Sequence, residues 1–214
     1  MEPAFWHERW EKKEIGFHEE RANELLIRHF PRLSLPDRST VFVPLCGKSL
    51  DLNWLLEQGN RVVGVELSED AVGEAFENMQ FAPSVEKIGE LKKFSSGDIT
   101  IYAGDFFTLT PDLIGSVDAI YDRAALVALP PGMRKDYTRH LVSLTTAVPQ
   151  LLISFDYDQS QTEGPPFSVP LAEIQQHYSS HYEENLLERR SITGQLAKRC
   201  AGEEIVVLLK KPQR

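Results

Sequence analysis

The fold is decided by residues 40–68, which read TVFVPLCGKSLDLNWLLEQGNRVVGVELS. Two short apolar runs in this stretch, residues 40–45 and 61–66, are typical of buried strands. The segment between them, residues 49–58, has helical character and stops at Gly59, a residue suited to a left-handed helix cap. A strand, a helix and a second strand in this order indicate an α/β fold with a mainly parallel sheet.

The same alternation continues along the chain. We expect a helix after Ser68, because serine is a favourable N-cap and acidic residues follow it in the first turn. Pro131 suits the first turn of another helix, which continues to about Thr146. Apolar runs predict three further strands, followed by an antiparallel pair that closes the sheet edge, at residues 98–103, 117–122, 151–156, 185–192 and 204–210.

Two segments stand outside this alternation. Residues 6–30 carry aromatic and aliphatic side chains that predict amphipathic helical structure ahead of the first strand. Residues 80–97 form an insertion before the third strand. Because the sequence has no repeat, low-complexity tract or linker, we predict one domain over residues 1–214, with a cover segment at residues 1–35 and a Rossmann-like core at residues 40–211.

Length and composition narrow the class of protein. Of the 214 residues, 42% are hydrophobic and 26% are charged, an ordinary globular balance. A formal net charge of −9 disfavours a nucleic-acid partner, because an acidic surface repels phosphate. The sequence has no bilayer-spanning apolar run and no signal pattern, and its two cysteines are too few for a disulfide framework. We therefore expect a cytoplasmic protein that contacts neither nucleic acid nor membrane.

Ligands of an open parallel sheet bind beyond the carboxyl ends of its strands, so the residues that follow each strand are candidates. Glu66 ends the second strand, where a carboxylate can accept hydrogen bonds from both ribose hydroxyls of an adenosine. After the third strand, Asp105 is placed to meet the adenine amino group and Phe106 to pack on the ring. The alternatives are a solvated glutamate at position 66 and an ordinary core phenylalanine at position 106.

The turn after the first strand holds a single glycine, Gly47. A dinucleotide fingerprint needs three glycines, and a P-loop needs one where Phe42 stands, so Gly47-Lys48-Ser49 is a false match to the P-loop. One glycine suffices for the backbone to approach the amino-acid portion of S-adenosylmethionine, which has no pyrophosphate. An NAD-dependent oxidoreductase and a non-catalytic binding protein stay open as alternatives, to be separated by a bound-nucleotide spectrum and a turnover assay.

Asp122 and Arg123 follow the fourth strand, where a methyl donor and its acceptor would meet. The planar guanidinium of Arg123 suits a carboxylate or an electron-rich acceptor, and we expect Asp122 to orient Arg123 or the donor. A structural salt bridge of Arg123 with Asp122 or another acid is the alternative. Both residues are interpreted as positioning groups, and no residue is assigned as a general base.

Other chemistry-bearing residues have simpler explanations. His177 and His181 have the spacing of metal ligands on a helix but lack the glutamate of the zinc-protease motif, which favours an exposed helix face. Asp156 and Asp158 fit a polar loop as well as they fit a metal pair. Cys46 fits a small buried turn residue better than a nucleophile, because no histidine lies near it in the sequence. We therefore expect no metal site.

Four motifs and an N-terminal pattern carry a family resemblance. The motifs are PLCGK at residues 44–48, VGVELS at residues 63–68, YDRAALVA at residues 121–128 and GPPF at residues 164–167, and the pattern is Trp6, Trp10 and GFH at residues 16–18. Over about residues 4–211, the chain resembles the thiopurine methyltransferase family, and its short tails resemble the bacterial branch.

The resemblance implies a seven-stranded class I methyltransferase fold that binds S-adenosyl-L-methionine at Trp10, Leu45, Glu66 and Arg123. It also implies an N-terminal cover over the cofactor, with Phe17 and Arg123 facing the acceptor. The implied reaction is methylation of sulfur in aromatic or heterocyclic thiols such as thiopurines, which leaves S-adenosyl-L-homocysteine. Selenium and tellurium compounds are implied as further acceptors, with a link to tellurite resistance, and we expect the enzyme to be a monomer.

Overall fold

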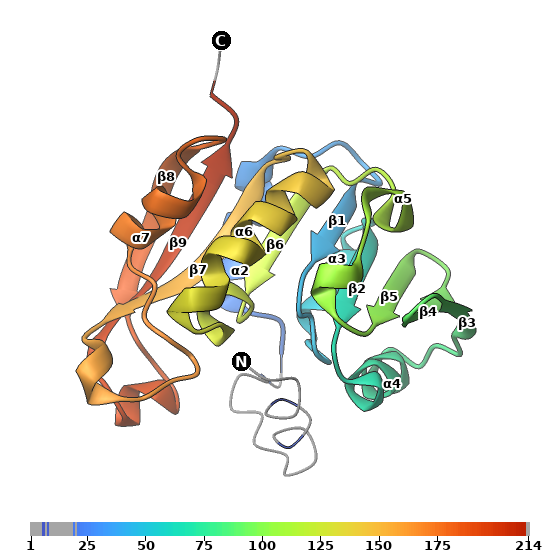
Figure 1. Ribbon diagram of the computed structural model, residues 1–214, viewed down its shortest axis with the longest axis horizontal. Coiled ribbons are helices and arrows are strands. Elements are labelled where there is room, and N and C mark those ends of the chain that lie inside the picture. Colours follow the sequence, from blue (N-terminus) through green and yellow to red (C-terminus); the bar gives the residue numbers. More distant parts are fainter. Residues whose placement is uncertain (1–5, 7, 9–18, 20, 213–214) are drawn as a thin grey trace.

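The computed structural model describes Trp6, Glu8, Glu19 and residues 21–212, and residues 21–212 place helices on both faces of a central sheet (Figure 1). The strands of these residues form one nine-stranded sheet in the order β3-β4-β5-β2-β1-β6-β7-β9-β8. Their bounds are Thr40–Val43 (β1), Arg61–Glu66 (β2), Ser84–Ile88 (β3), Leu91–Ser96 (β4), Ile99–Ala103 (β5), Ala119–Arg123 (β6), Gln150–Tyr157 (β7), Glu183–Ser191 (β8) and Gly202–Lys210 (β9).

The helices divide between the two faces of the sheet. One face is covered by α2 (Glu24–His29), α3 (Asp51–Glu57) and α4 (Glu69–Asn78), and the other by α5 (Pro111–Ile114), α6 (Pro131–Thr145) and α7 (Leu171–Tyr178). Short 3-10 turns are η1 (Phe30–Leu33), η2 (Phe106–Thr108), η3 (Leu126–Ala128), η4 (Gln159–Gln161) and η5 (Leu196–Lys198). Ser68 caps α4 as predicted, with its Oγ accepting a hydrogen bond from the Ala71 N–H at 3.2 Å.

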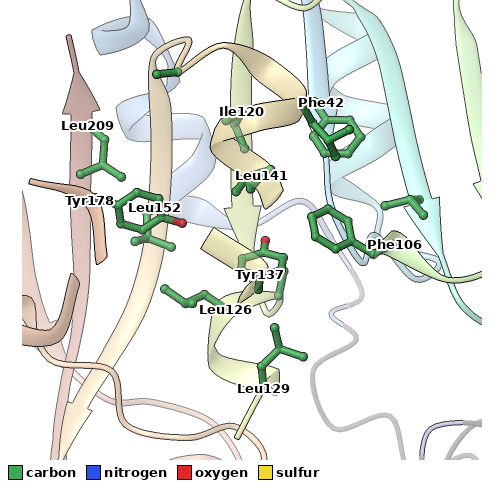
Figure 2. Close-up of a cluster of buried hydrophobic side chains, with 14 of the residues drawn as sticks. Phe42, Phe106, Ile120, Leu126, Leu129, Tyr137, Leu141, Leu152, Tyr178 and Leu209 are labelled. Atoms are coloured by element: carbon green, nitrogen blue, oxygen red, sulfur yellow. The ribbon is translucent and has the colours of Figure 1, made fainter. Parts of the chain in front are cut away.

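The central strands are apolar throughout because both of their faces are buried. In β1, Val41 and Val43 pack toward α2, α3 and α4, whereas Phe42 packs toward α5 and α6. Figure 2 shows the cluster that contains Phe42, in which Leu141 of α6 lies beside Ile120 of β6 and Tyr137 of α6 lies near Leu126. The predicted α/β fold is confirmed, and the strand predicted at residues 61–66 matches β2 residue for residue.

The insertion at residues 80–97 corrects the expected strand count from seven to nine. It contains β3 and β4, an antiparallel hairpin that adds to the edge strand β5. The turn between the two strands needs Gly89, whose φ is +60°. Four of the five residues of β3 are exposed, so its sequence, SVEKI, carries no apolar face to reveal it. The other seven strands are the predicted set, including the antiparallel pair β8–β9 at the opposite edge.

Candidate active site

A cavity of about 560 Å³ opens beyond the carboxyl ends of the parallel strands. Five of the predicted site residues line it together: Leu45, Glu66, Asp105, Phe106 and Arg123. They come from four different strand ends, which the parallel sheet brings to one edge. The volume lies within the range of about 300–1,000 Å³ that is typical of small-molecule sites.

Glu66, the last residue of β2, is the most firmly held acid of this cavity. Its Oε2 accepts a hydrogen bond from the Gly47 N–H and its Oε1 accepts one from the Ser68 N–H, both at 2.9 Å. The residue is only 6% exposed, which excludes the alternative of a solvated strand-end glutamate. A carboxylate oxygen can accept more than one hydrogen bond, so Glu66 keeps acceptor capacity toward the cavity.

The turn after β1 lies at the cavity, which Leu45, Cys46, Lys48 and Ser49 line, whereas Gly47 is not among the lining residues. Leu45 and Gly47 both have positive φ angles, 46° and 53°, and the Cys46 N–H donates to the Val65 carbonyl at 2.9 Å. Left-handed backbone at a non-glycine residue such as Leu45 is uncommon and often marks a functional site. Gly64 is required beside this turn, because a Cβ at that position would lie 2.9 Å from the Cys46 Sγ.

Cys46 is buried, as the sequence indicated for a small turn residue. Burial raises the pKa of the Cys46 thiol well above its usual value, and the charge of Glu66 raises it further. The thiol therefore stays protonated near neutral pH, which makes it a poor nucleophile.

Asp105 and Phe106 follow β5, as expected. Asp105 is exposed and its Oδ1 accepts a hydrogen bond from the Phe107 N–H at 2.9 Å, so it caps η2. Phe106 is 4% exposed and its ring centroid lies 5.0 Å from that of Tyr137. Phe106 is thus both a core residue and part of the cavity wall, so the two interpretations of this residue are compatible.

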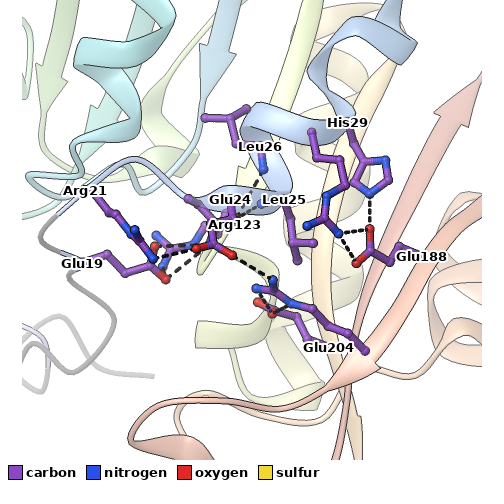
Figure 3. A network of polar contacts seen from close by, with 12 residues as sticks. Glu19, Arg21, Glu24, Leu25, Leu26, His29, Arg123, Glu188 and Glu204 are labelled. Carbon is purple, nitrogen blue, oxygen red and sulfur yellow. Dashed lines mark hydrogen bonds and ion pairs between the residues drawn. The ribbon is translucent and has the colours of Figure 1, made fainter.

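Arg123 ends β6 and joins the cavity to the segment that precedes α2 (Figure 3). Its guanidinium contacts Glu19 at 2.6 Å and the Asp51 Oδ2 at 3.5 Å. Asp51 also accepts hydrogen bonds from the Tyr121 hydroxyl at 2.9 Å and from the Asn23 N–H at 2.7 Å. Burial opposes the charge of Arg123, but Tyr121, Asp51 and Glu19 raise its pKa overall, so the guanidinium stays cationic.

The expectation that Asp122 orients Arg123 is wrong, whereas its alternative role, orienting the donor, stays a prediction. Neighbouring strand residues point to opposite faces of a sheet, and Asp122 faces α6 while Arg123 faces α3. The Asp122 carboxylate accepts hydrogen bonds from the Tyr137 hydroxyl at 2.8 Å and the Leu126 N–H at 3.1 Å. Asp122 therefore fixes the loop after β6, whose Val127 lines the cavity, instead of the guanidinium of Arg123.

Several functional residues were missed or lie elsewhere. Trp10 and Phe17 fall outside the described residues. Sequence reasoning missed Glu19 and Asp51, the acids that contact Arg123, although Asp51 is the first residue of the helix that follows the glycine turn. It also missed the cations of the β8–β9 region that line the cavity, Arg190 and Arg199, because its strand-end rule considered parallel strands only.

Three residues that the sequence analysis considered as metal ligands, His177, Asp156 and Asp158, make other contacts within the protein. His177 Nε2 lies 3.3 Å from Glu173 Oε1, one turn earlier on α7, and Asp156 Oδ2 lies 3.3 Å from Arg189 Nη1. Asp158 caps η4. Within the described ranges, no group of three or more His, Cys, Asp or Glu side chains is arranged to hold a metal ion. Among the helices described, none combines the length and the apolar character that crossing a bilayer requires.

Solved structures share this architecture at low sequence identity. The 1,6-didemethyltoxoflavin-N1-methyltransferase of Burkholderia thailandensis, with bound 1,6-didemethyltoxoflavin and S-adenosylhomocysteine, gives a TM-score of 0.67 at 14% identity, over 98% of this chain and 87% of that chain. An S-adenosylmethionine-dependent methyltransferase from Anabaena variabilis gives a TM-score of 0.65 at 13% identity, over 98% of this chain and 95% of that chain. The fold is therefore that of the class I S-adenosylmethionine-dependent methyltransferases, here extended by the β3–β4 hairpin.

Sequence comparison defines the family. A sequence model of the thiopurine S-methyltransferase family matches residues 1–211. The thiopurine S-methyltransferase of Gluconobacter oxydans is 50% identical over 203 residues, which cover 95% of this chain and 92% of the relative. The thiopurine S-methyltransferase of Xanthobacter autotrophicus is 49% identical over 212 residues, which cover 99% of this chain and 100% of the relative. The chain belongs to the thiopurine S-methyltransferase family, a family of S-adenosylmethionine-dependent methyltransferases.

Proposed function

We propose that this enzyme transfers the methyl group of S-adenosylmethionine to the sulfur of aromatic or heterocyclic thiols of the thiopurine type. The observation that carries the proposal is the wall of the cavity beside Arg123, where a half-buried guanidinium meets a largely apolar surface. That surface includes Leu129, Ile153, Phe155 and the Pro165-Pro166 turn. A flat, partly anionic heterocycle fits an apolar wall next to a guanidinium better than an aliphatic amine does.

The cofactor fits the residues at the other end of the cavity. Glu66 would accept hydrogen bonds from the ribose hydroxyls, and the left-handed turn at Leu45 and Gly47 would let the backbone approach the methionine portion. Asp105 and Phe106 would contact the adenine, from the amino group and from the ring face respectively. Arg123 would meet the methionine carboxylate, and the family resemblance adds Trp10 to this set.

The protein's contribution to the reaction is alignment and exclusion of water. When bound, S-adenosylmethionine supplies an electrophilic methyl carbon, which an acceptor sulfur takes as the sulfonium sulfur leaves. The wall residues Leu129, Ile153 and Phe155 hold the acceptor ring, while Arg123 favours the thiolate over the thiol. The thiol proton passes to solvent before transfer, because thiols of this kind ionise near neutral pH. Phe17 stays a proposed acceptor contact on the family resemblance.

The physiological setting is also a proposal. We place the enzyme in the cytoplasm as a single-domain monomer that acts on small molecules. Selenium and tellurium compounds are proposed as additional acceptors, because both elements are softer nucleophiles than oxygen and need no general base. Nucleic acid is not expected to bind, since the formal net charge is −9.

A rate comparison tests the acceptor. Initial rates should be measured for a thiopurine, a catechol and an amine with labelled S-adenosylmethionine and without added metal, and then for selenite and tellurite. We expect sulfur to be methylated fastest. Faster methylation of oxygen or nitrogen would overturn the proposed acceptor, and binding without any turnover would favour a cofactor-binding protein.

A further inference from the structure

The cavity has a second half that the cofactor residues do not use. β8 runs in the same direction as β7, because each is antiparallel to β9. Residues 192–201, between β8 and β9, therefore lie at the same edge of the sheet as the loop that follows β7. Thr193, Gly194, Gln195, Leu196 and Arg199 from this segment line the cavity.

The charged side chains along the cavity are mostly paired. Lys48 pairs with Glu74, and Arg123 pairs with Glu19 and Asp51. Arg190 pairs with Glu204 at 2.7 Å. These three cations already have carboxylate partners, so an additional anion would have to compete for each of them.

Arg199 differs from the other three cations. Its Nη2 donates to a neutral group, the Thr162 hydroxyl, and none of the carboxylates described in the structure forms an ion pair with it. A guanidinium has five N–H donors in a planar fork, so donors remain for a ligand. The side chain is exposed and lines the cavity from the β8–β9 segment, whereas Glu66 ends β2, which β1, β6 and β7 separate from β9 in the sheet.

The position of Arg199 is fixed by the backbone around it. Its N–H donates to the Leu196 carbonyl at 2.9 Å, within the turn that includes η5. Two residues later, the Ala201 N–H donates to Gln161 Oε1 at 2.9 Å, which ties this segment to the loop after β7. Pro165 and Pro166 of that same loop also line the cavity, so both segments form one wall.

We propose that Arg199 is a specificity residue that binds an anionic substituent of the acceptor, and that the preferred substrates are aromatic or heterocyclic thiols bearing a carboxylate. The inference rests on the proposed function, since it assigns a substrate class to that same site. A carboxylate matches the planar fork of arginine through two parallel hydrogen bonds. The acceptor ring then lies against Phe155 and the Pro165-Pro166 turn, between Arg199 and the cofactor residues.

The test compares 4-mercaptobenzoate with its methyl ester, which has the same ring and thiol without the charge. For Arg199→Gln, kcat/KM for the acid should fall about tenfold through a higher KM, the scale of one lost charge-assisted pair, while kcat/KM for the ester stays within twofold. Arg199→Lys should restore part of the loss. Lys198→Gln is the matched control, because Lys198 is exposed, contacts Gln195 and does not line the cavity.

Two results would overturn the role of Arg199. One is an equal loss for acid and ester in Arg199→Gln, and the other is the same selective loss in Lys198→Gln. Calorimetry of the two compounds with the S-adenosylhomocysteine-loaded enzyme gives the same comparison without turnover. A chain that methylates no thiol but binds the acid more weakly after Arg199→Gln would therefore contradict the proposed function and support the binding role.

Discussion

In the half of the cavity beside β1 and β2, the functional carboxylate of Glu66 is held by backbone N–H groups from two neighbouring turns. In the half beside β7 and β8, charged side chains are held by one another, as Arg190 is by Glu204 and Glu24. The first arrangement is local in space and uses backbone positions that any sequence with the right turn provides. The second depends on particular side chains, so a single substitution there removes a contact that no backbone group replaces.

The largest effect is expected at Arg123, which lies between the two halves. Arg123→Ala should lower kcat/KM about 100–1,000-fold, because it removes the cation that we propose binds the cofactor carboxylate and favours the acceptor thiolate. The free energy of unfolding should change less, since Asp51 keeps its hydrogen bonds from Tyr121 and Asn23. Steady-state kinetics and denaturant titration of the same samples measure both quantities.

The matched control for Arg123 is Arg38→Ala. Arg38 is an exposed arginine that pairs with Asp98 at 3.2 Å, away from the cavity. Its removal should leave turnover unchanged. A loss of stability in Arg123→Ala that accounts for the whole loss of activity would show that this arginine is structural.

The neighbouring residue, Asp122, should affect stability with a defined pH dependence. Burial raises the pKa of Asp122 from 3.8 to about 6, although hydrogen bonds from Tyr137 and the backbone oppose this. Between pH 4 and 6, the folded chain then holds a proton that the unfolded chain releases, so the contribution of Asp122 to stability falls as pH rises through this window. The rise in the pKa of Asp122 from 3.8 to about 6 corresponds to a loss of about 3 kcal/mol of stability between pH values below both pKa values and pH values above both.

Asp122→Asn isolates this contribution, because asparagine keeps an oxygen that can accept from the Leu126 N–H. The free energy of unfolding of the variant minus that of the wild type should increase by up to about 3 kcal/mol from pH 4 to pH 8, mostly below pH 6. Urea titrations at intervals of one pH unit measure this difference. A difference that does not vary with pH would contradict the raised pKa.

A smaller effect is expected in the cofactor half. Glu66→Ala should weaken S-adenosylmethionine binding by about 1–3 kcal/mol, the scale for a lost charged acceptor. Glu204→Gln, which changes a carboxylate of the acceptor half, should leave that affinity nearly unchanged. Calorimetry on folded variants measures the affinity for S-adenosylmethionine. Equal affinities for Glu66→Ala and the wild type would show that Glu66 does not bind the cofactor.

The smallest expected change concerns residues 6–17, which lie within the cover segment predicted at residues 1–35. We expect hydrogen exchange in this segment to slow when the cofactor binds, because aromatic residues there gain an apolar surface to contact. Trp6, the described residue of this range that lines the cavity, supports a position near the ligand. Equal exchange with and without cofactor would favour a segment docked permanently on the protein.

Sequence reasoning succeeded where a local pattern had one physical cause. The continuous apolar run at residues 61–66 predicted β2, because a strand buried on both faces must be apolar throughout. It failed at β3, because an exposed edge strand needs no apolar pattern. The strand-end rule identified Glu66, Asp105, Phe106 and Arg123, which line one cavity, since the rule for parallel sheets depends on topology alone.

By itself, the sequence determined the alternation of strands and helices, the glycine turn and the acid that ends β2. Each of these is set by neighbours within a few residues, through burial, capping or backbone conformation. Only the tertiary structure decided which face of the sheet Asp122 and Arg123 occupy, and which acids reach the guanidinium. Glu19 and Asp51 are separated from Arg123 by 104 and 72 residues along the chain. Side-chain pairs at such separations are chosen by the packing of whole elements, which no local pattern specifies.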